Sequence, residues 1–187
     1  ETTIVLDTRK IYLVADQFGN PIPDSVTHEP SVSTGYDDIG VLVYAQRGAM
    51  LIREGQLPEA LAQLDHAVDF LEYAPPVDRA KVLLNRGELH GLLGDLAQAK
   101  DDCALALRLA LESGPAELVF YATHNLGWYE FLSGNLPRAL ELMPTGEDAL
   151  PDFERGIVGM DRAKALLSAG LVTEADRSLI DVCAAFG

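Results

Sequence analysis

The cysteines and histidines are the side chains whose chemistry would suit a nucleophile or a metal ligand. They are Cys103, Cys183, His28, His66, His90 and His124. A catalytic cysteine needs a histidine within hydrogen-bond reach. Cys103 falls instead one turn after an alanine on the inward face of a predicted helix, where burial blunts thiol reactivity. Cys183 lies beside the corresponding position of the last helix, so both cysteines are interpreted as buried structural thiols.

Established catalytic motifs are missing from the sequence. It contains no HExxH, CxxC or GxSxG pattern and no glycine-rich phosphate loop. The acidic residues Asp101, Asp102 and Glu141 are most simply solvated helix faces. We therefore expect no enzyme, no metal site and no cofactor.

Composition limits the classes of partner. The chain has 187 residues, of which 29 are acidic and 14 basic, for a net charge of −15. Nucleic acids and anionic membrane surfaces both require clustered Lys and Arg, so both are disfavoured. No apolar run approaches the roughly 18 residues of a membrane span. Because the first residue is Glu1, we expect a processed or shortened chain. With two cysteines, the default location is the cytoplasm.

A short pattern recurs four times in phase. A four-residue block ends in a small residue at Gly48, Gly87, Gly127 and Ala163. Seven residues later comes a glycine, at Gly55, Gly94, Gly134 and Gly170, with spacings of 39, 40 and 36 residues. An aliphatic residue follows two positions later, and three positions after it stands Ala60, Ala99, Ala139 or Ala175. The chain is therefore read as four repeats.

Each slot of the repeat has a physical reading. Glycine inside a helix costs about 1 kcal/mol relative to alanine, which makes sense where another helix passes close by. The second glycine suits the left-handed residue that ends a helix. Asp95 and Asn135 are good N-caps for the helix that follows. The alanines then lie in its first turns, where close packing also favours a small side chain. Each repeat is thus two antiparallel helices with a tight turn.

The pattern predicts eight helices and four units. The helices cover roughly 38–54, 57–74, 77–93, 96–113, 116–133, 136–149, 153–169 and 172–185. The units cover about 37–75, 76–115, 116–151 and 152–187. Proline and glycine punctuation sets the breaks between units. Pro144 should end or kink the sixth helix.

The two ends of the chain depart from the pattern. Residues 1–36 form an N-terminal arm with two short β-prone runs, 3–6 and 11–14, which predict a hairpin. An isolated hairpin is marginal in water, so it must pack on the helices, pair with another chain or be the remnant of a lost domain. The last helix carries little polar surface for a capping helix. We expect the natural chain to continue, or this end to be covered in an oligomer.

These repeats resemble the tetratricopeptide repeat family over residues 37–187. The resemblance implies an all-α, right-handed superhelix, although the family's usual spacing is shorter, about 34 residues. Residues 84–87, 134–140 and 161–167 are similar to repeats of large actinobacterial proteins, which often precede a caspase-like CHAT protease domain. That domain is absent from this sequence. The resemblance therefore implies a recognition or sensing arm and supplies no catalytic residue.

An aromatic stripe is the best candidate for binding. Tyr121, His124, Trp128 and Phe131 share one helix face, and the resemblance implies that this face lines a concave groove. Aromatic anchors in a groove suit a bound peptide. The alternative is packing against a neighbouring unit, the N-terminal arm or another copy, because exposed aromatic patches are uncommon.

Basic residues complete the sequence-based hypothesis. Lys81 and Arg86 are placed on the rim of the groove. Arg47, Arg86 and Arg162 recur just before the small residue, which favours a structural role in bridging acids between helices. The favoured function is binding of a protein or peptide. The alternatives are a regulatory fragment of a CHAT-type protease and a structural module that self-associates through its N-terminal arm or its uncapped C-terminal helix.

Overall fold

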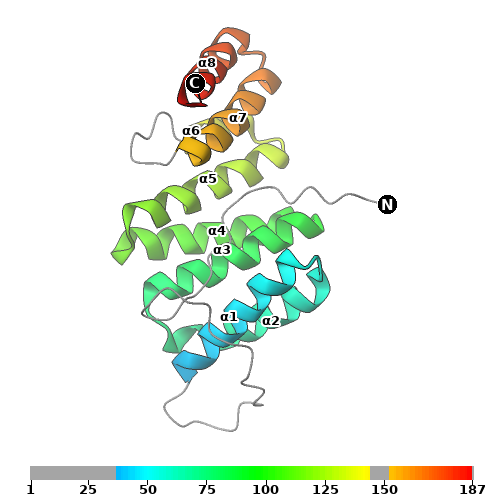
Figure 1. Ribbon diagram of the computed structural model, residues 1–187, viewed down its shortest axis with the longest axis vertical. Coiled ribbons are helices and arrows are strands. Elements are labelled where there is room, and N and C mark those ends of the chain that lie inside the picture. Colours follow the sequence, from blue (N-terminus) through cyan, green and yellow to red (C-terminus); the bar gives the residue numbers. More distant parts are fainter. Residues whose placement is uncertain (1–36, 144–151, 187) are drawn as a thin grey trace. The chain divides into compact units, whose positions relative to one another are not determined.

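The described part of the protein is entirely helical. The computed structural model describes residues 37–143 and 152–186, and in these ranges it contains helices and no strand (Figure 1). The elements are α1 (Asp37–Arg53), α2 (Leu57–Asp69), the short 3-10 helix η1 (Leu71–Tyr73), α3 (Pro76–Leu93), α4 (Leu96–Ser113), α5 (Ala116–Leu132), α6 (Leu136–Leu142), α7 (Asp152–Ser168) and α8 (Val172–Phe186). The hairpin predicted within residues 1–36 lies outside the described residues.

Two helices end earlier than the sequence pattern predicts. The second helix ends at Asp69 and gives way to η1. The sixth ends at Leu142, short of the predicted residue 149. Proline has no N–H to bond the carbonyl four residues back, so Pro144 leaves the Leu140 oxygen without its helical donor. That oxygen instead accepts a hydrogen bond from Arg162 at 3.0 Å.

The chain divides into two compact units between Gly114 and Pro115. The first unit contains the hairpins α1–α2 and α3–α4, and the second contains α5–α6 and α7–α8. Paired helices lie side by side within each hairpin (Figure 1). Each unit is described below by itself.

The predicted turn glycines all adopt the left-handed conformation. Their φ angles are 76° at Gly55, 86° at Gly94, 82° at Gly134 and 77° at Gly170. In the second hairpin the N–H of Gly94 bonds the Gly91 oxygen at 3.2 Å, and the N–H of Asp95 bonds the His90 oxygen at 2.8 Å. The other three turns repeat this pair of bonds. This is the Schellman arrangement, which satisfies the carbonyls at the end of the first helix.

The two predicted N-caps behave differently. The Asp95 side chain accepts a hydrogen bond from the Gln98 N–H at 3.2 Å, which confirms it as a cap. Asn135 takes the predicted N-cap position of α6, but its side chain makes no capping hydrogen bond. Its side-chain amide donates instead to Glu130 Oε2 at 3.0 Å, back across the turn.

The small residues lie where the helices of a hairpin touch. A Cβ added at Gly87 would lie 3.1 Å from Cys103 Sγ and 3.2 Å from the Ala99 oxygen. At Gly48 the same atom would come within 2.7 Å of Leu64 Cγ. The four repeated alanines are fully buried: Ala60, Ala99, Ala139 and Ala175. These observations confirm the predicted close contact within each hairpin.

Candidate binding surface

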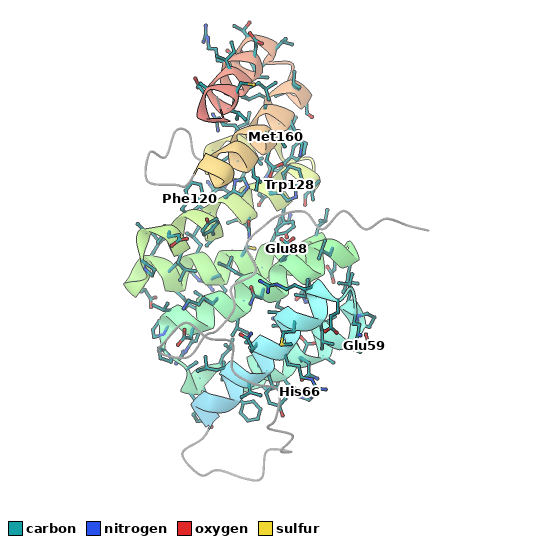
Figure 2. All side chains as sticks on the ribbon, viewed as in Figure 1. Glu59, His66, Glu88, Phe120, Trp128 and Met160 are labelled. Atoms are coloured by element: carbon teal, nitrogen blue, oxygen red, sulfur yellow. The ribbon has the colours of Figure 1, made fainter. Side chains whose placement is uncertain are left out.

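The aromatic stripe of α5 is buried within the second unit. Tyr121, His124 and Trp128 are 6%, 2% and 7% exposed, and Phe131 is half-buried. The Trp128 and Phe131 rings are 5.3 Å apart. Phe120, which was not singled out from the sequence, adds a ring 5.6 Å from Tyr121 and 6.3 Å from His124 (Figure 2).

Helix α7 supplies the partners of this stripe. His124 Nε2 lies 3.4 Å from Asp161 Oδ2, and both side chains are 3% exposed. The Lys164 ammonium lies 5.1 Å from the centre of the Trp128 ring and 2.9 Å from Asp161 Oδ1. Burial raises the pKa of Asp161, but the nearby His124 and the hydrogen bond from Lys164 outweigh it, so the net pKa is lowered. These contacts favour the packing interpretation of the stripe.

Arg86 holds three helices together instead of standing free on a rim. Its guanidinium donates two hydrogen bonds of 2.8 Å to Asp102 on α4 and one of 3.0 Å to Asp65 on α2. Burial lowers its pKa, but the hydrogen bond to Asp102 is the largest influence, and the net pKa is raised. The predicted role in bridging acids between helices is confirmed for Arg86. Lys81 pairs with Asp78 on its own helix at 3.3 Å.

The contacts of the other two repeated arginines, Arg162 and Arg47, differ from those of Arg86. Arg162 donates to the carbonyl oxygens of Leu140 at 3.0 Å and Met143 at 2.6 Å, so its described partners are carbonyls and not the predicted acids. Burial lowers its pKa. Arg47 is exposed. What Arg86 and Arg162 share is that each reaches back from a first helix to the second helix of the preceding hairpin.

The two cysteines differ in burial. Cys103 is fully buried against the α3–α4 contact, as predicted. Cys183 is exposed, so its interpretation as a buried thiol is wrong. It lies on an outward stripe of α8, while Val182 takes the inward position: a Cβ at Gly159 of α7 would collide with Val182.

The last hairpin presents a set of large apolar side chains to solvent, which we call the end face. It consists of Met160, Leu167, Leu171, Val172, Leu179 and Ile180. Helical spacing puts Met160 and Leu167 on one side of α7 and Val172, Leu179 and Ile180 on one side of α8, and Leu171 lies in the turn between the two helices. Met160 is labelled in Figure 2. The end face belongs to the helix interpreted from the sequence as poorly capped.

Equivalent positions in the other repeats show what is unusual about the end face. Leu64, Cys103 and Met143 occupy the same slot as Leu179, four residues after the repeated alanine, and are at most 1% exposed. Leu179 is 37% exposed. In α7, Met160 and Leu167 correspond to His124 and Phe131 of the aromatic stripe, and they are 45% and 50% exposed. The face predicted for binding is therefore exposed in α7 and covered in α5.

Sequence reasoning missed a recurring buried polar position. Two residues before each small residue stand Gln46, Asn85, Asn125 and Asp161, which are 1% to 5% exposed. The signal was present in the aligned blocks, because all four residues are polar. Their burial could not be read from type alone, since polar residues on helices are usually exposed.

Comparison with known proteins adds no relative. No protein-family model matches the chain, and no curated protein matches it. Among the described residues, no three His, Cys, Asp or Glu side chains are grouped so as to hold a metal ion. The helices of ranges 37–143 and 152–186 include none that is both long and apolar enough to cross a membrane.

Proposed function

We propose that the chain is a scaffold of the tetratricopeptide type, a right-handed superhelix that binds a polypeptide partner. The repeated left-handed glycine turns and the close contacts at Gly48, Gly87 and Gly127 support the repeat assignment. The end face supports the binding role. Reading the aromatic stripe as packing moves the proposed contact surface from α5 to the last hairpin.

The exposed apolar area is the observation that carries the proposal. Val172 and Ile180 of α8 are 63% and 58% exposed, and Leu167 of α7 is 50% exposed. Single apolar residues on a surface are ordinary, but a contiguous group marks an interaction site. Ridges of apolar side chains along two adjacent helices suit an amphipathic helix laid between them.

Charge indicates the polarity of the partner. Asp176 is exposed on α8 and, by helical spacing, lies among Val172, Leu179 and Ile180. The whole chain carries −15. We therefore propose a partner that combines apolar anchors with Lys or Arg. The low cysteine content of two residues suits the cytoplasm as the proposed site of action.

Selection from a display library of amphipathic helical peptides would test the proposal. We expect enriched peptides to carry basic residues beside their apolar anchors. Their binding should fall at least about tenfold, or roughly 1.4 kcal/mol, with Ile180→Asn, which removes an apolar anchor without adding charge. Leu111→Asn is the matched control, because Leu111 on α4 is 66% exposed and lies outside the end face. Failure to enrich any peptide, or equal binding by the two variants, would contradict the proposal.

A further inference from the structure

Within the first unit, the structure shows how one hairpin covers the next. The α2 residues Leu57, Leu61 and Leu64 pack in one cluster with Leu89 and Leu92 of α3. Towards the other end of α2, Ala67 and Val68 pack with Val82 of α3. The Arg86–Asp65 bond of 3.0 Å closes this contact between hairpins. The second helix of one hairpin thus presents an apolar stripe, and the first helix of the next hairpin covers that stripe.

The second unit repeats this contact between α6 and α7. Leu140 of α6 packs against Ala163 and Leu166 of α7. Arg162 of α7 bonds the carbonyl oxygens of Leu140 and Met143. In both units the covering helix therefore sends an arginine to the preceding second helix.

The covering helices share a sequence pattern that also occurs in α1. A valine stands four residues before the arginine: Val82 and Arg86 in α3, Val158 and Arg162 in α7, and Val43 and Arg47 in α1. Three residues after the arginine, α3 has the apolar Leu89 and α1 has Met50. In α1, Arg47 and Arg53 are exposed and Met50 is 37% exposed. The face of α1 therefore has the chemistry of a covering helix.

We infer that the end face of one copy binds the α1 face of a second copy, head to tail. This inference rests on the proposed binding role of the end face and names its occupant. The alignment of repeats sets the register, because Leu140, an acceptor of Arg162, corresponds to Asp176 of α8. Asp65, the acceptor of Arg86, corresponds to Ile180. Arg47 of the second copy would thus meet α8 between residues 176 and 180, where the Asp176 carboxylate is exposed.

A head-to-tail contact has a consequence that a symmetric dimer lacks. It joins two different surfaces, so every open assembly keeps one free end face and one free α1 face. Wild-type protein should therefore grow in mass with concentration beyond two chains. A variant with either surface blocked should not associate with itself. When a chain with a blocked end face is mixed with a chain with a blocked α1 face, one intact surface remains on each, and the two chains should form a dimer.

Sedimentation velocity with two complementary variants tests this arrangement. Ile180→Asn removes an apolar anchor of the end face without supplying an acid for Arg47, and Arg47→Glu blocks the α1 face. Both residues are exposed, and circular dichroism checks that helicity is unchanged. We expect wild type and the control Leu111→Asn to associate alike. Each blocking variant alone should sediment as a single chain, and their equimolar mixture should give two chains and no more.

Several outcomes would overturn the inference. Wild type that stays a single chain up to about 1 mM, the weak limit of specific association, excludes it. A mixture that stays monomeric does the same, as does an Arg47→Glu protein that still dimerises, which would indicate a tail-to-tail contact. Peptide binding at Ile180 would survive any of these results, so the binding proposal and this inference can fail separately.

Discussion

Leu64 and Leu179 occupy the same slot of the repeat in the first and last hairpins and have different surroundings. Leu64 lies against Gly48 of α1 and in one cluster with Leu89 and Leu92 of α3, and it is fully buried, whereas Leu179 is 37% exposed. Both follow a left-handed glycine turn and a fully buried alanine. The turn and the alanine contact are thus set by residues within one repeat, while burial at this slot also depends on the helices that pack around the hairpin.

The largest expected effect separates these two leucines. Leu64→Ala should lower the free energy of unfolding by about 3 kcal/mol, because it leaves a cavity beneath α3. Leu179→Ala should cost less than about 1 kcal/mol, because solvent already reaches the side chain. Urea unfolding followed by circular dichroism measures both. Equal losses of unfolding free energy in the two variants would contradict the proposed difference between Leu64 and Leu179.

Removal of the Asp102 carboxylate should come next in size. Asp102→Ala leaves Arg86 without its bidentate partner in a largely buried site, so we expect a loss of about 2–3 kcal/mol. The matched control is Glu141→Ala, since Glu141 pairs with Arg138 on the surface at 2.9 Å. That pair should be worth under about 0.5 kcal/mol. A loss at Asp102 no larger than at Glu141 would show that the Arg86–Asp102 bridge within the second hairpin is dispensable.

The buried Asp161 should make the second unit sensitive to acid. Its pKa is lowered in the folded protein, so its contribution is complete above the unfolded value of about 3.9 and disappears as the pH falls through the folded value. Asp161→Asn should cost about 1 kcal/mol near pH 7. The difference from wild type should shrink below about pH 4. Trp128, the only tryptophan, reports unfolding of this unit by fluorescence; a difference that persists in acid would contradict the assignment.

Replacing the turn glycine by alanine should cost the same stability in the second hairpin as in the last. Gly94→Ala and Gly170→Ala each force a left-handed φ on alanine and should cost about 1 kcal/mol. Gly40 in α1 has open space around its missing Cβ, so Gly40→Ala should be neutral or stabilising by up to about 1 kcal/mol. Thermal unfolding of the three variants gives the comparison. A much smaller effect at Gly170 than at Gly94 would mean that the last hairpin is not built like the second.

Features set by neighbours along the chain could be predicted from the sequence. The glycine spacing located the turns, and the alanines and Cys103 marked the contact inside each hairpin, because both depend on residues within one repeat. The end of α6 was harder to place, since the Leu140 carbonyl there accepts a hydrogen bond from Arg162 of α7, which lies far along the chain.

Features set by tertiary neighbours could not be predicted in the same way. Trp128 and Met160 stand in almost the same stripe, yet α7 covers the first while the second is 45% exposed. Cys183 was misplaced for the same reason, because helical periodicity identifies a stripe but does not say whether another helix lies over it.

Thiol labelling at one repeat slot tests the account most directly. With Cys183 replaced by serine, the native Cys103 can be compared with a second variant that carries Cys103→Ala and Leu179→Cys. Both thiols stand four residues after the repeated alanine. We predict that maleimide modifies position 179 within about tenfold of the unfolded rate, and Cys103 at least about a hundredfold more slowly, because it reacts only after local unfolding. Equal protection of the two thiols in dilute protein would show that the end face is already covered, contrary to this account.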